Sequence, residues 1–152
     1  MPGYKTHLAL GLATFLLISS LTRPNININR PEELLLYMGA ALLGSLFPDI
    51  DIASKMQNLF YSGASITLLI ALLSHALTIF FLTSFFCFLV TILRHRTITH
   101  RIWFLIAFPT FTACCVNHFN RIDPHVISYL SLFFIGGALS HVILDKTISS
   151  LK

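Results

Sequence analysis

LFYSGASITLLIALLSHALTIFFLTSFFCFLVTIL, residues 59–93, is an apolar run that contains no Asp, Glu, Lys or Arg. A transmembrane helix needs about 20 apolar residues, so this run is long for one crossing and just long enough for two short ones. Ser74 and His75 stand at its middle, where they could form the turn of a hairpin. One long helix, two short crossings and a re-entrant hairpin are therefore the alternatives, and the choice among them decides the topology of the chain.

The composition of the whole chain indicates an integral membrane protein. Hydrophobic residues make up 55% of the chain and charged residues only 11%, which leaves too little polar surface for a soluble domain. The net charge of +4 is not gathered into a basic run, and a bias of positive residues toward the cytoplasmic side explains it. We therefore expect no nucleic-acid partner.

Four further apolar segments flank the central run, and none shows the sustained alternation of a strand. An open sheet cannot lie in lipid, so each segment is predicted to be a helix. The predicted fold class is all-α, a multi-pass transmembrane helical bundle with about six crossings, or four plus a re-entrant hairpin. It forms a single membrane-embedded domain over residues 1–152. The four segments are Leu8–Leu21, Leu34–Phe47, Ile102–Val116 and Val126–Leu144.

Several residues refine this picture of the helices. Glu32 and Glu33 favour the start of a helix, where acidic groups are stabilised, and Pro48 ends that helix. Polar stretches predict loops at residues 22–31, 53–58 and 117–125. Four glycines suit the close approach of helices in a membrane. They are Gly39, Gly44, Gly136 and Gly137.

Acidic and histidine side chains gather at the ends of the segments. Such groups are expensive among so many apolar residues, and in a membrane protein they usually mark function. Imidazole and carboxylate together are the donors that zinc-like ions bind, whereas the three cysteines lack the spacing of a thiolate site. The candidate metal ligands are His7, Asp49, Asp51, His95, His100, His141 and Asp145.

Two of these pairs have spacings that allow shared coordination. His141 and Asp145 are four residues apart, so they lie one turn apart on the same helical face. Asp49 and Asp51 follow Pro48, and in an irregular turn both carboxylates can converge on an ion. Each pair alone is equally consistent with helix caps and helix-terminal acids.

His95 and His100 are five residues apart, which places them about 140° apart on a continuous helix. They could share an ion only if the turn between them is not helical, and Thr99 would then cap the next helix. The alternative is a basic membrane anchor in which Arg96 and Arg101 matter and the histidines do not. His75, His118 and His125 lack acidic partners at useful spacing, apart from Asp123 near His125, and are left out of the site.

The candidate ligands can meet only if the central run crosses the membrane an even number of times. His7 begins the first segment, and Asp49 and Asp51 follow the second, so these three ligands lie on the same face of the membrane. The ligands after residue 93 also share one face of the membrane, because two precede the next-to-last segment and two end the last. They are His95, His100, His141 and Asp145. Basic residues predominate on the resulting site face, which predicts that it is cytoplasmic. They are Lys5, Lys55, Arg94, Arg96, Arg101, Lys146 and Lys152, against Arg23, Arg30 and Arg121.

The order of these motifs resembles the YdjM-like family of bacterial inner-membrane proteins, which are described as metal-dependent hydrolases. The motifs are His7, Pro-Asp-Ile-Asp at 48–51, His-Arg-Thr-Ile-Thr-His at 95–100 and Ser-His-Val-Ile-Leu-Asp at 140–145. The resemblance implies a multi-pass protein of the bacterial inner membrane and metal-ligand roles for the seven candidates. More distantly, the order is similar to that of zinc phospholipase C and nuclease P1 enzymes, which implies a phosphoester substrate.

The function we expect is hydrolysis by a metal-activated water, with Zn²⁺ or Mn²⁺ as the ion. Asp49 or Asp51 would act as general base or bridging ligand, and Arg96 and Arg101 would neutralise an anionic substrate. A site at the cytoplasmic interface suits a membrane lipid or lipid-linked substrate. The alternatives are a metal-ion or proton transporter that uses the same cluster, and a non-catalytic membrane protein with a structural metal.

Overall fold

The computed structural model describes residues 4–22, 30–50, 55–92, 100–119 and 123–150. All regular elements among these residues are helices, so the all-α class is confirmed. The chain divides into two compact units, one formed by Met1–Pro48 with His100–Lys152 and the other by Asp49–Thr99. The expectation of one membrane-embedded domain stays a prediction.

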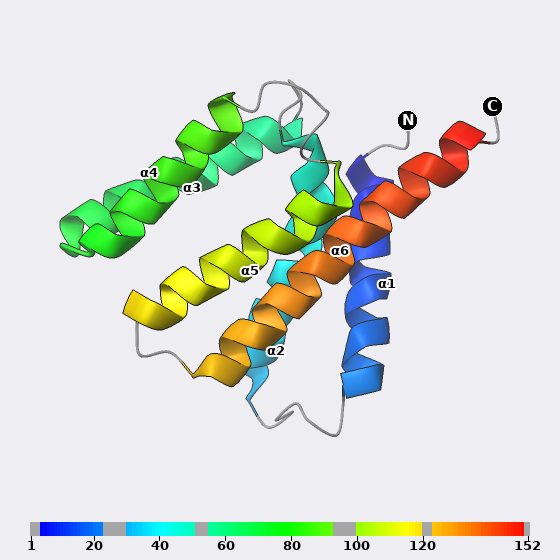
Figure 1. Cartoon of the computed structure of the whole chain (residues 1–152), viewed down its shortest axis with the longest axis horizontal. Helices are drawn as coiled ribbons and strands as arrows, with labels where there is room; N and C mark the ends of the chain where they lie inside the picture. Colours follow the sequence, from blue (N-terminus) through cyan, green and yellow to red (C-terminus); the bar gives the residue numbers. More distant parts are fainter. Residues whose placement is uncertain (1–3, 23–29, 51–54, 93–99, 120–122, 151–152) are drawn as a thin grey trace. The chain divides into compact units, whose positions relative to one another are not determined.

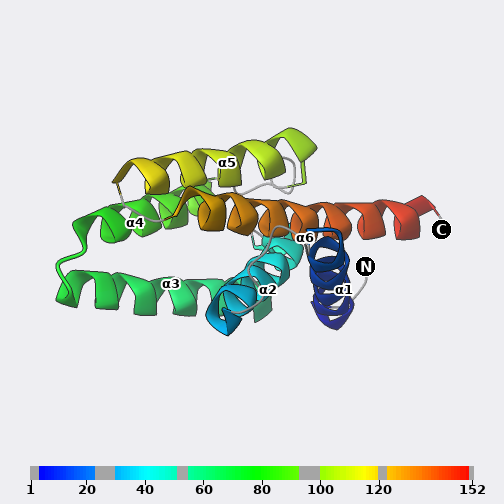
Figure 2. The ribbon, with the colours of Figure 1, turned by 90° about the horizontal axis from the view of Figure 1, so that it is seen from below.

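The first unit is built around the longest helix, α6 (Pro124–Ser150). Helices α1 (Tyr4–Thr22), α2 (Pro31–Leu46) and α5 (Ile102–Phe119) all pack against it. Figure 1 shows α6 running between α5 and α1, and Figure 2 shows α5 on one side of α6 with α1 and α2 on the other. A short 3₁₀ helix, η1 (Phe47–Asp49), follows α2 directly.

Glycines bring α2 and α6 into backbone contact. A Cβ atom at Gly44 would overlap the carbonyl oxygen of Phe134, and one at Gly137 would overlap that of Ala41. A Cβ atom at Gly136 would meet the side chain of Ile18 on α1. The predicted close approach is thus confirmed at Gly44 and Gly137, where a side chain would overlap backbone, and Gly136 lies in close contact with side chains of α1.

Gly39 does not share this role. Among the residues that the structure describes, no atom lies within 4 Å of the position that its Cβ atom would occupy. The prediction of close helix approach was therefore wrong at this position. The residue type alone could not reveal which face of α2 turns toward α6.

Aromatic side chains hold the first unit together on either side of the glycine contact. Phe133 on α6 stacks on Tyr37 of α2, with ring centroids 5.2 Å apart, and both side chains are buried. At the other end of α2, Phe47 stacks on Phe108 of α5 at 5.4 Å and meets Phe134 edge to face at 5.2 Å. These contacts fix the end of α2 between α5 and α6.

The helix ends agree with the sequence in part. Glu32 and Glu33 lie in the first turn of α2, and η1 containing Pro48 replaces the helix after Leu46, as predicted. The predicted loop at 117–125 is too long, because α5 continues to Phe119 and α6 begins at Pro124. Hydropathy marks the part of a helix that suits lipid, and a helix can continue through polar residues beyond it.

The second unit is a helical hairpin. Helix α3 (Lys55–Leu73) and helix α4 (Leu77–Ile92) are antiparallel, since Phe60 near the start of α3 contacts Phe86 late in α4 at 5.4 Å. The central apolar run therefore folds as two helices, and the alternative of one long helix is wrong. The loop predicted at 53–58 is also too long, because α3 already begins at Lys55.

The turn of the hairpin lies at Ser74 and His75, as the sequence suggested. His75 adopts φ 55°, a left-handed conformation that is uncommon for a side-chain-bearing residue. The Ala76 N–H donates to the carbonyl of Ala71 (2.8 Å) and the His75 N–H to that of Leu72 (3.2 Å). These two bonds form a Schellman motif, which satisfies the last carbonyls of α3 and turns the chain.

Two of the described helices, α1 and α6, are long and apolar enough to cross a membrane. Residues 57–73, 77–91 and 102–118 form shorter apolar helices. Large apolar side chains on α1 point outward, including Leu16 and Leu17, each 60% exposed, and Leu21, which is 72% exposed. Such an apolar exterior suits contact with lipid.

Candidate metal centre

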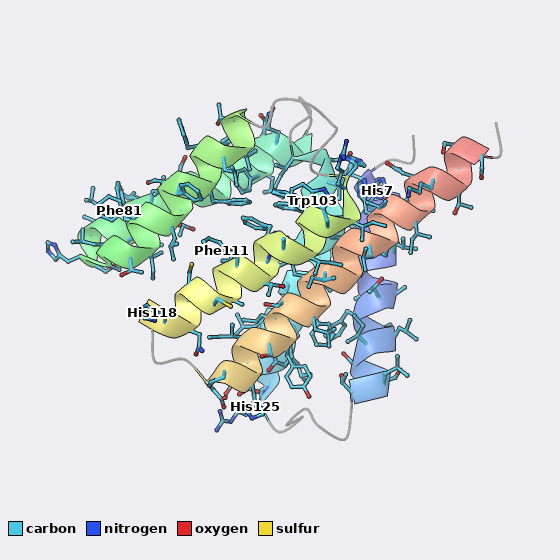
Figure 3. The ribbon with its side chains drawn as sticks, in the orientation of Figure 1. His7, Phe81, Trp103, Phe111, His118 and His125 are labelled. Atoms are coloured by element: carbon cyan, nitrogen blue, oxygen red, sulfur yellow. The ribbon has the colours of Figure 1, made fainter. Side chains whose placement is uncertain are left out.

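The candidate centre lies in the first unit, where α1, α6 and the turn before α5 meet. His7 lies in the first turn of α1, His100 lies in the turn two residues before α5 begins, and His141 and Asp145 lie in the C-terminal half of α6. Figure 3 shows His7 beside this part of α6, while His118 and His125 lie at the far end of α5 and α6. Sequence reasoning had left those two histidines out of the site.

Asp145 is the focus of the cluster. Its carboxylate oxygens lie 3.8 Å from His7 Nε2, 3.7 Å from His100 Nε2 and 3.5 Å from His141 Nε2. These separations exceed the 2.7–3.2 Å of ordinary N–H···O hydrogen bonds, so the groups face one another without direct bonding at these atoms. Three imidazoles, from α1, from α6 and from the turn before α5, thus surround one carboxylate.

The rings of the cluster are packed against one another. His7 and His141 stack with centroids 3.8 Å apart and an interplanar angle of 15°. The ring of His100 meets His141 edge to face at 5.6 Å. This packing limits the rotation of the imidazoles and keeps their Nε2 atoms turned toward Asp145.

Burial divides the cluster into a closed side and an open side. The side chains of His7 and His141 are 2% and 0% exposed, whereas those of Asp145 and His100 are 17% and 20% exposed. An ion held here would therefore be fixed by the buried pair and reached from the side of Asp145 and His100. Catalytic metal sites need such an open position, while structural sites are closed.

A backbone contact orients His141. The carbonyl oxygen of Ser45, at the end of α2, lies 2.7 Å from His141 Nδ1 in a buried setting. A carbonyl can only accept, so Nδ1 carries the hydrogen and the lone pair of the neutral ring is on Nε2, which faces Asp145. Metal-binding histidines are commonly held by such a bond from the other ring nitrogen.

The sequence around Pro48 explains why this carbonyl is available. The last carbonyls of a helix have no partner within it. A 3₁₀ turn would pair the Ser45 carbonyl with the N–H of the residue three positions later, but proline has no N–H. Sequence reasoning treated Pro48 only as a helix end and missed this support of His141, although the proline was its visible sign.

The cluster fits a divalent ion by donor type and by spacing. His100, His141 and Asp145 each offer a ligand atom, and these atoms lie within 4.8 Å of one another. Two ligands that bind Zn²⁺ tetrahedrally at about 2.0–2.1 Å are roughly 3.4 Å apart, close to the 3.5–3.8 Å between Asp145 and the imidazoles. Asp145 Oδ1 is buried and accepts no hydrogen bond from the part of the chain that the structure describes.

The remaining candidates from the sequence stand as follows. Asp49 ends η1, directly after Pro48, and belongs to the second unit. Arg101 follows His100 and is exposed, and its carbonyl accepts from the first N–H groups of α5. Asp51, His95 and Arg96 lie outside the described residues, as does the cap predicted at Thr99. Within the first unit, the structure brings together His7, His100, His141 and Asp145.

Comparison with known proteins identifies the family. The model of the YdjM inner membrane protein family matches residues 1–150, so the chain belongs to that family and is a protein of the inner membrane. Neither the curated proteins nor the solved structures contain a significant match. The family's description names a location and no activity, so hydrolysis and zinc binding stay predictions.

Proposed function

We propose that the protein is a membrane-embedded, metal-dependent hydrolase that acts on a lipid phosphoester at the cytoplasmic face of the inner membrane. The observation that carries this proposal is the convergence of three imidazole Nε2 atoms on the Asp145 carboxylate, at 3.5–3.8 Å. Pairs of histidine and aspartate are common at helix ends, but four such groups from α1, α6 and the turn before α5 around one point call for a common ligand. A divalent ion provides it.

The proposed ligands are the three histidines and Asp145, with Zn²⁺ as the ion and Mn²⁺ as the alternative. When bound, such an ion supplies a water of lowered pKa and stabilises negative charge on a phosphoryl oxygen. The buried His7 and His141 would fix the position of the ion, and the Ser45 carbonyl would fix the tautomer of His141. Asp145 and His100, on the exposed side, leave room for water and substrate.

Other residues would handle the proton and the charge of the substrate. We assign the role of general base or bridging ligand to Asp49 or Asp51, which follow Ser45 by four and six residues. Arg101, exposed and adjacent to His100, would bind an anionic oxygen of the substrate, and Arg96 would do the same. His95 completes the proposed set of ligands.

The orientation of the site follows from charge. Lys5, Arg101 and Lys146 are exposed at the end of the first unit that carries the cluster, and Arg30 lies at the opposite end of α2. Positive residues near helix ends favour the cytoplasmic side, so we propose that the cluster faces the cytoplasm. The phosphate groups of membrane lipids lie at that depth.

The full topology is also part of the proposal. We infer about six crossings, or four crossings with the α3–α4 hairpin re-entering from one side. A helix of 16 residues such as α4 rises about 24 Å, which is short of a hydrocarbon core of about 30 Å. Both versions return the chain to the face from which it entered.

Metal content tests the proposal. We expect mass spectrometry of the detergent-purified protein, reconstituted with Zn²⁺ and Mn²⁺, to find bound metal that is lost in His141→Ala and in Asp51→Asn. His125→Ala is the matched control, because His125 is an exposed imidazole at the far end of α6. The metal-loaded protein should then release phosphate or a phosphorylated headgroup from a lipid phosphoester.

Two results would contradict the proposal. One is an intact protein that holds no metal after reconstitution. The other is a metal content that His141→Ala and His125→Ala lower equally, since binding would then not depend on the cluster.

A further inference from the structure

A groove lies between α1 and α6, the two helices that carry His7, His141 and Asp145. It has a volume of about 330 Å³, at the lower end of the range for ligand sites. Each helix lines it with four residues at positions i, i+3, i+4 and i+7, from Leu10 to Leu17 and from Ser140 to Thr147. These are the residues that share one face of a helix, so the groove runs along both helices.

The hydroxyl groups that line the groove are already hydrogen-bonded within their own helices. Most of the lining is aliphatic, and the three hydroxyl groups within it already donate to carbonyls of their own helices. Thr14 donates to Leu10 at 2.8 Å, Ser140 to Gly137 at 2.7 Å and Thr147 to Ile143 at 2.8 Å. A hydrocarbon chain can therefore occupy the groove without leaving these polar groups unsatisfied.

The groove has one end near the cluster. On α1, Leu10 lies about one turn after His7, and on α6 Leu144 lies about one turn after His141, so each helix carries a lining residue beside a cluster residue. From Leu10 the groove extends for about 10 Å along α1, away from the cluster. A lipid with its head at the cluster would direct its chain along this path.

Charge at the mouth favours an anionic head. Lys5, which precedes His7, and Lys146, which follows Asp145, are both exposed. A phosphate that reaches the cluster would meet positive charge on both helices that form the groove. A partner helix is a poorer occupant, because a helix is about 10–12 Å wide and needs a longer face than two turns.

We infer that this groove is a subsite for one acyl chain of an anionic phospholipid whose phosphate lies at the His/Asp cluster. The inference rests on the proposed function and names the substrate class, a lipid with a phosphate that is reached at the membrane surface. Recognition of the chain would place the phosphoester at the cluster and would explain why the site lies at the end of two apolar helices.

Photo-crosslinking tests the inference without requiring catalysis. The probe is phosphatidic acid with a diazirine in the middle of one acyl chain, present at trace amounts in phosphatidylcholine nanodiscs that contain the full-length protein. We expect labelling of the lining residues Ala13, Thr14 and Ser140 by tandem mass spectrometry, and a several-fold decrease when unlabelled phosphatidic acid is added. The same amount of additional phosphatidylcholine should leave the labelling unchanged.

Two adjacent leucines supply a matched pair of variants. Leu17 lines the groove and Leu16 does not, yet both are 60% exposed on α1 and both lie more than two turns from His7. Leu17→Trp should decrease the labelling of Ala13, Thr14 and Ser140 several-fold, whereas Leu16→Trp should leave it near the wild-type level. The metal content of both variants should equal that of the wild type, which shows that the cluster is intact.

The outcomes separate this inference from the proposed function. Labelling that phosphatidic acid does not compete, or that both tryptophan variants lower equally, would overturn the groove as a subsite. Competition and loss confined to Leu17→Trp would support it. A protein that binds no metal but retains competed labelling would refute the hydrolase and leave a lipid-binding groove. A protein that binds metal without competed labelling would refute the groove alone.

Discussion

Gly137→Ala should weaken both the fold and the candidate metal centre, although it adds only one methyl group. The new Cβ atom would overlap the carbonyl oxygen of Ala41 and lie 2.9 Å from the Ser45 nitrogen. Both contacts are with backbone, which cannot rotate away as a side chain can. Since carbon atoms pack at about 3.5–4.0 Å, α2 and α6 must separate by roughly 1 Å.

The magnitude follows from these two contacts. Overpacking of a close interface costs about 1–3 kcal/mol, and this exceeds the gain of at most about 1 kcal/mol in helix propensity when alanine replaces glycine. The same movement carries the Ser45 carbonyl away from His141 Nδ1, which it approaches at 2.7 Å. Loss of such an outer contact commonly lowers metal affinity about 10–100-fold.

Gly39→Ala is the matched control, because nothing lies within 4 Å of its Cβ position. It should stabilise the protein by roughly 0.5–1 kcal/mol. Reversible unfolding in mixed micelles, followed by circular dichroism during titration with SDS, measures both free energies, and competition with a zinc indicator measures affinity. If Gly137→Ala is as stable as Gly39→Ala, the close contact of α2 and α6 is refuted.

Two further predictions concern the hairpin and the carboxylate. His75→Gly should stabilise the α3–α4 hairpin by about 1 kcal/mol, because glycine adopts the observed φ of 55° without the penalty of a side chain. The same SDS titration measures this change in the free energy of unfolding. An unchanged midpoint would argue against the Schellman turn. Zn²⁺ at a hundred times its Kd should stabilise the wild type by about 2.7 kcal/mol, whereas Asp145→Asn, of nearly equal volume, should gain much less. Equal stabilisation of both proteins by Zn²⁺ would show that Asp145 is not a ligand of the ion.

The sequence allowed the helical class and much of the site to be predicted. Charged groups in an apolar chain mark function, and this argument selected His7, His100, His141 and Asp145, which the structure brings together. The spacing of His141 and Asp145 placed them on one face of α6. Ser74 and His75 were suggested as a turn because they interrupt an apolar run that is too long for one helix.

Other features were outside the reach of sequence reasoning. The stacking of His7 on His141 depends on the crossing of α1 and α6, which hydropathy does not specify. The carbonyl of Ser45 belongs to the backbone, so no side-chain pattern reveals it. Gly39 and Gly44 looked alike in the sequence, but only Gly44 faces α6. Helix ends were misjudged where polar residues continue a helix beyond its apolar part.

The most direct test of the central claim is X-ray absorption spectroscopy at the zinc edge on the purified, zinc-loaded protein. The account predicts a first shell of nitrogen and oxygen only, at about 2.0–2.1 Å, with the multiple scattering of several imidazoles that decreases in His141→Ala. Sulfur ligands at about 2.3 Å, from cysteines such as Cys114, or a spectrum unchanged in His141→Ala would contradict it.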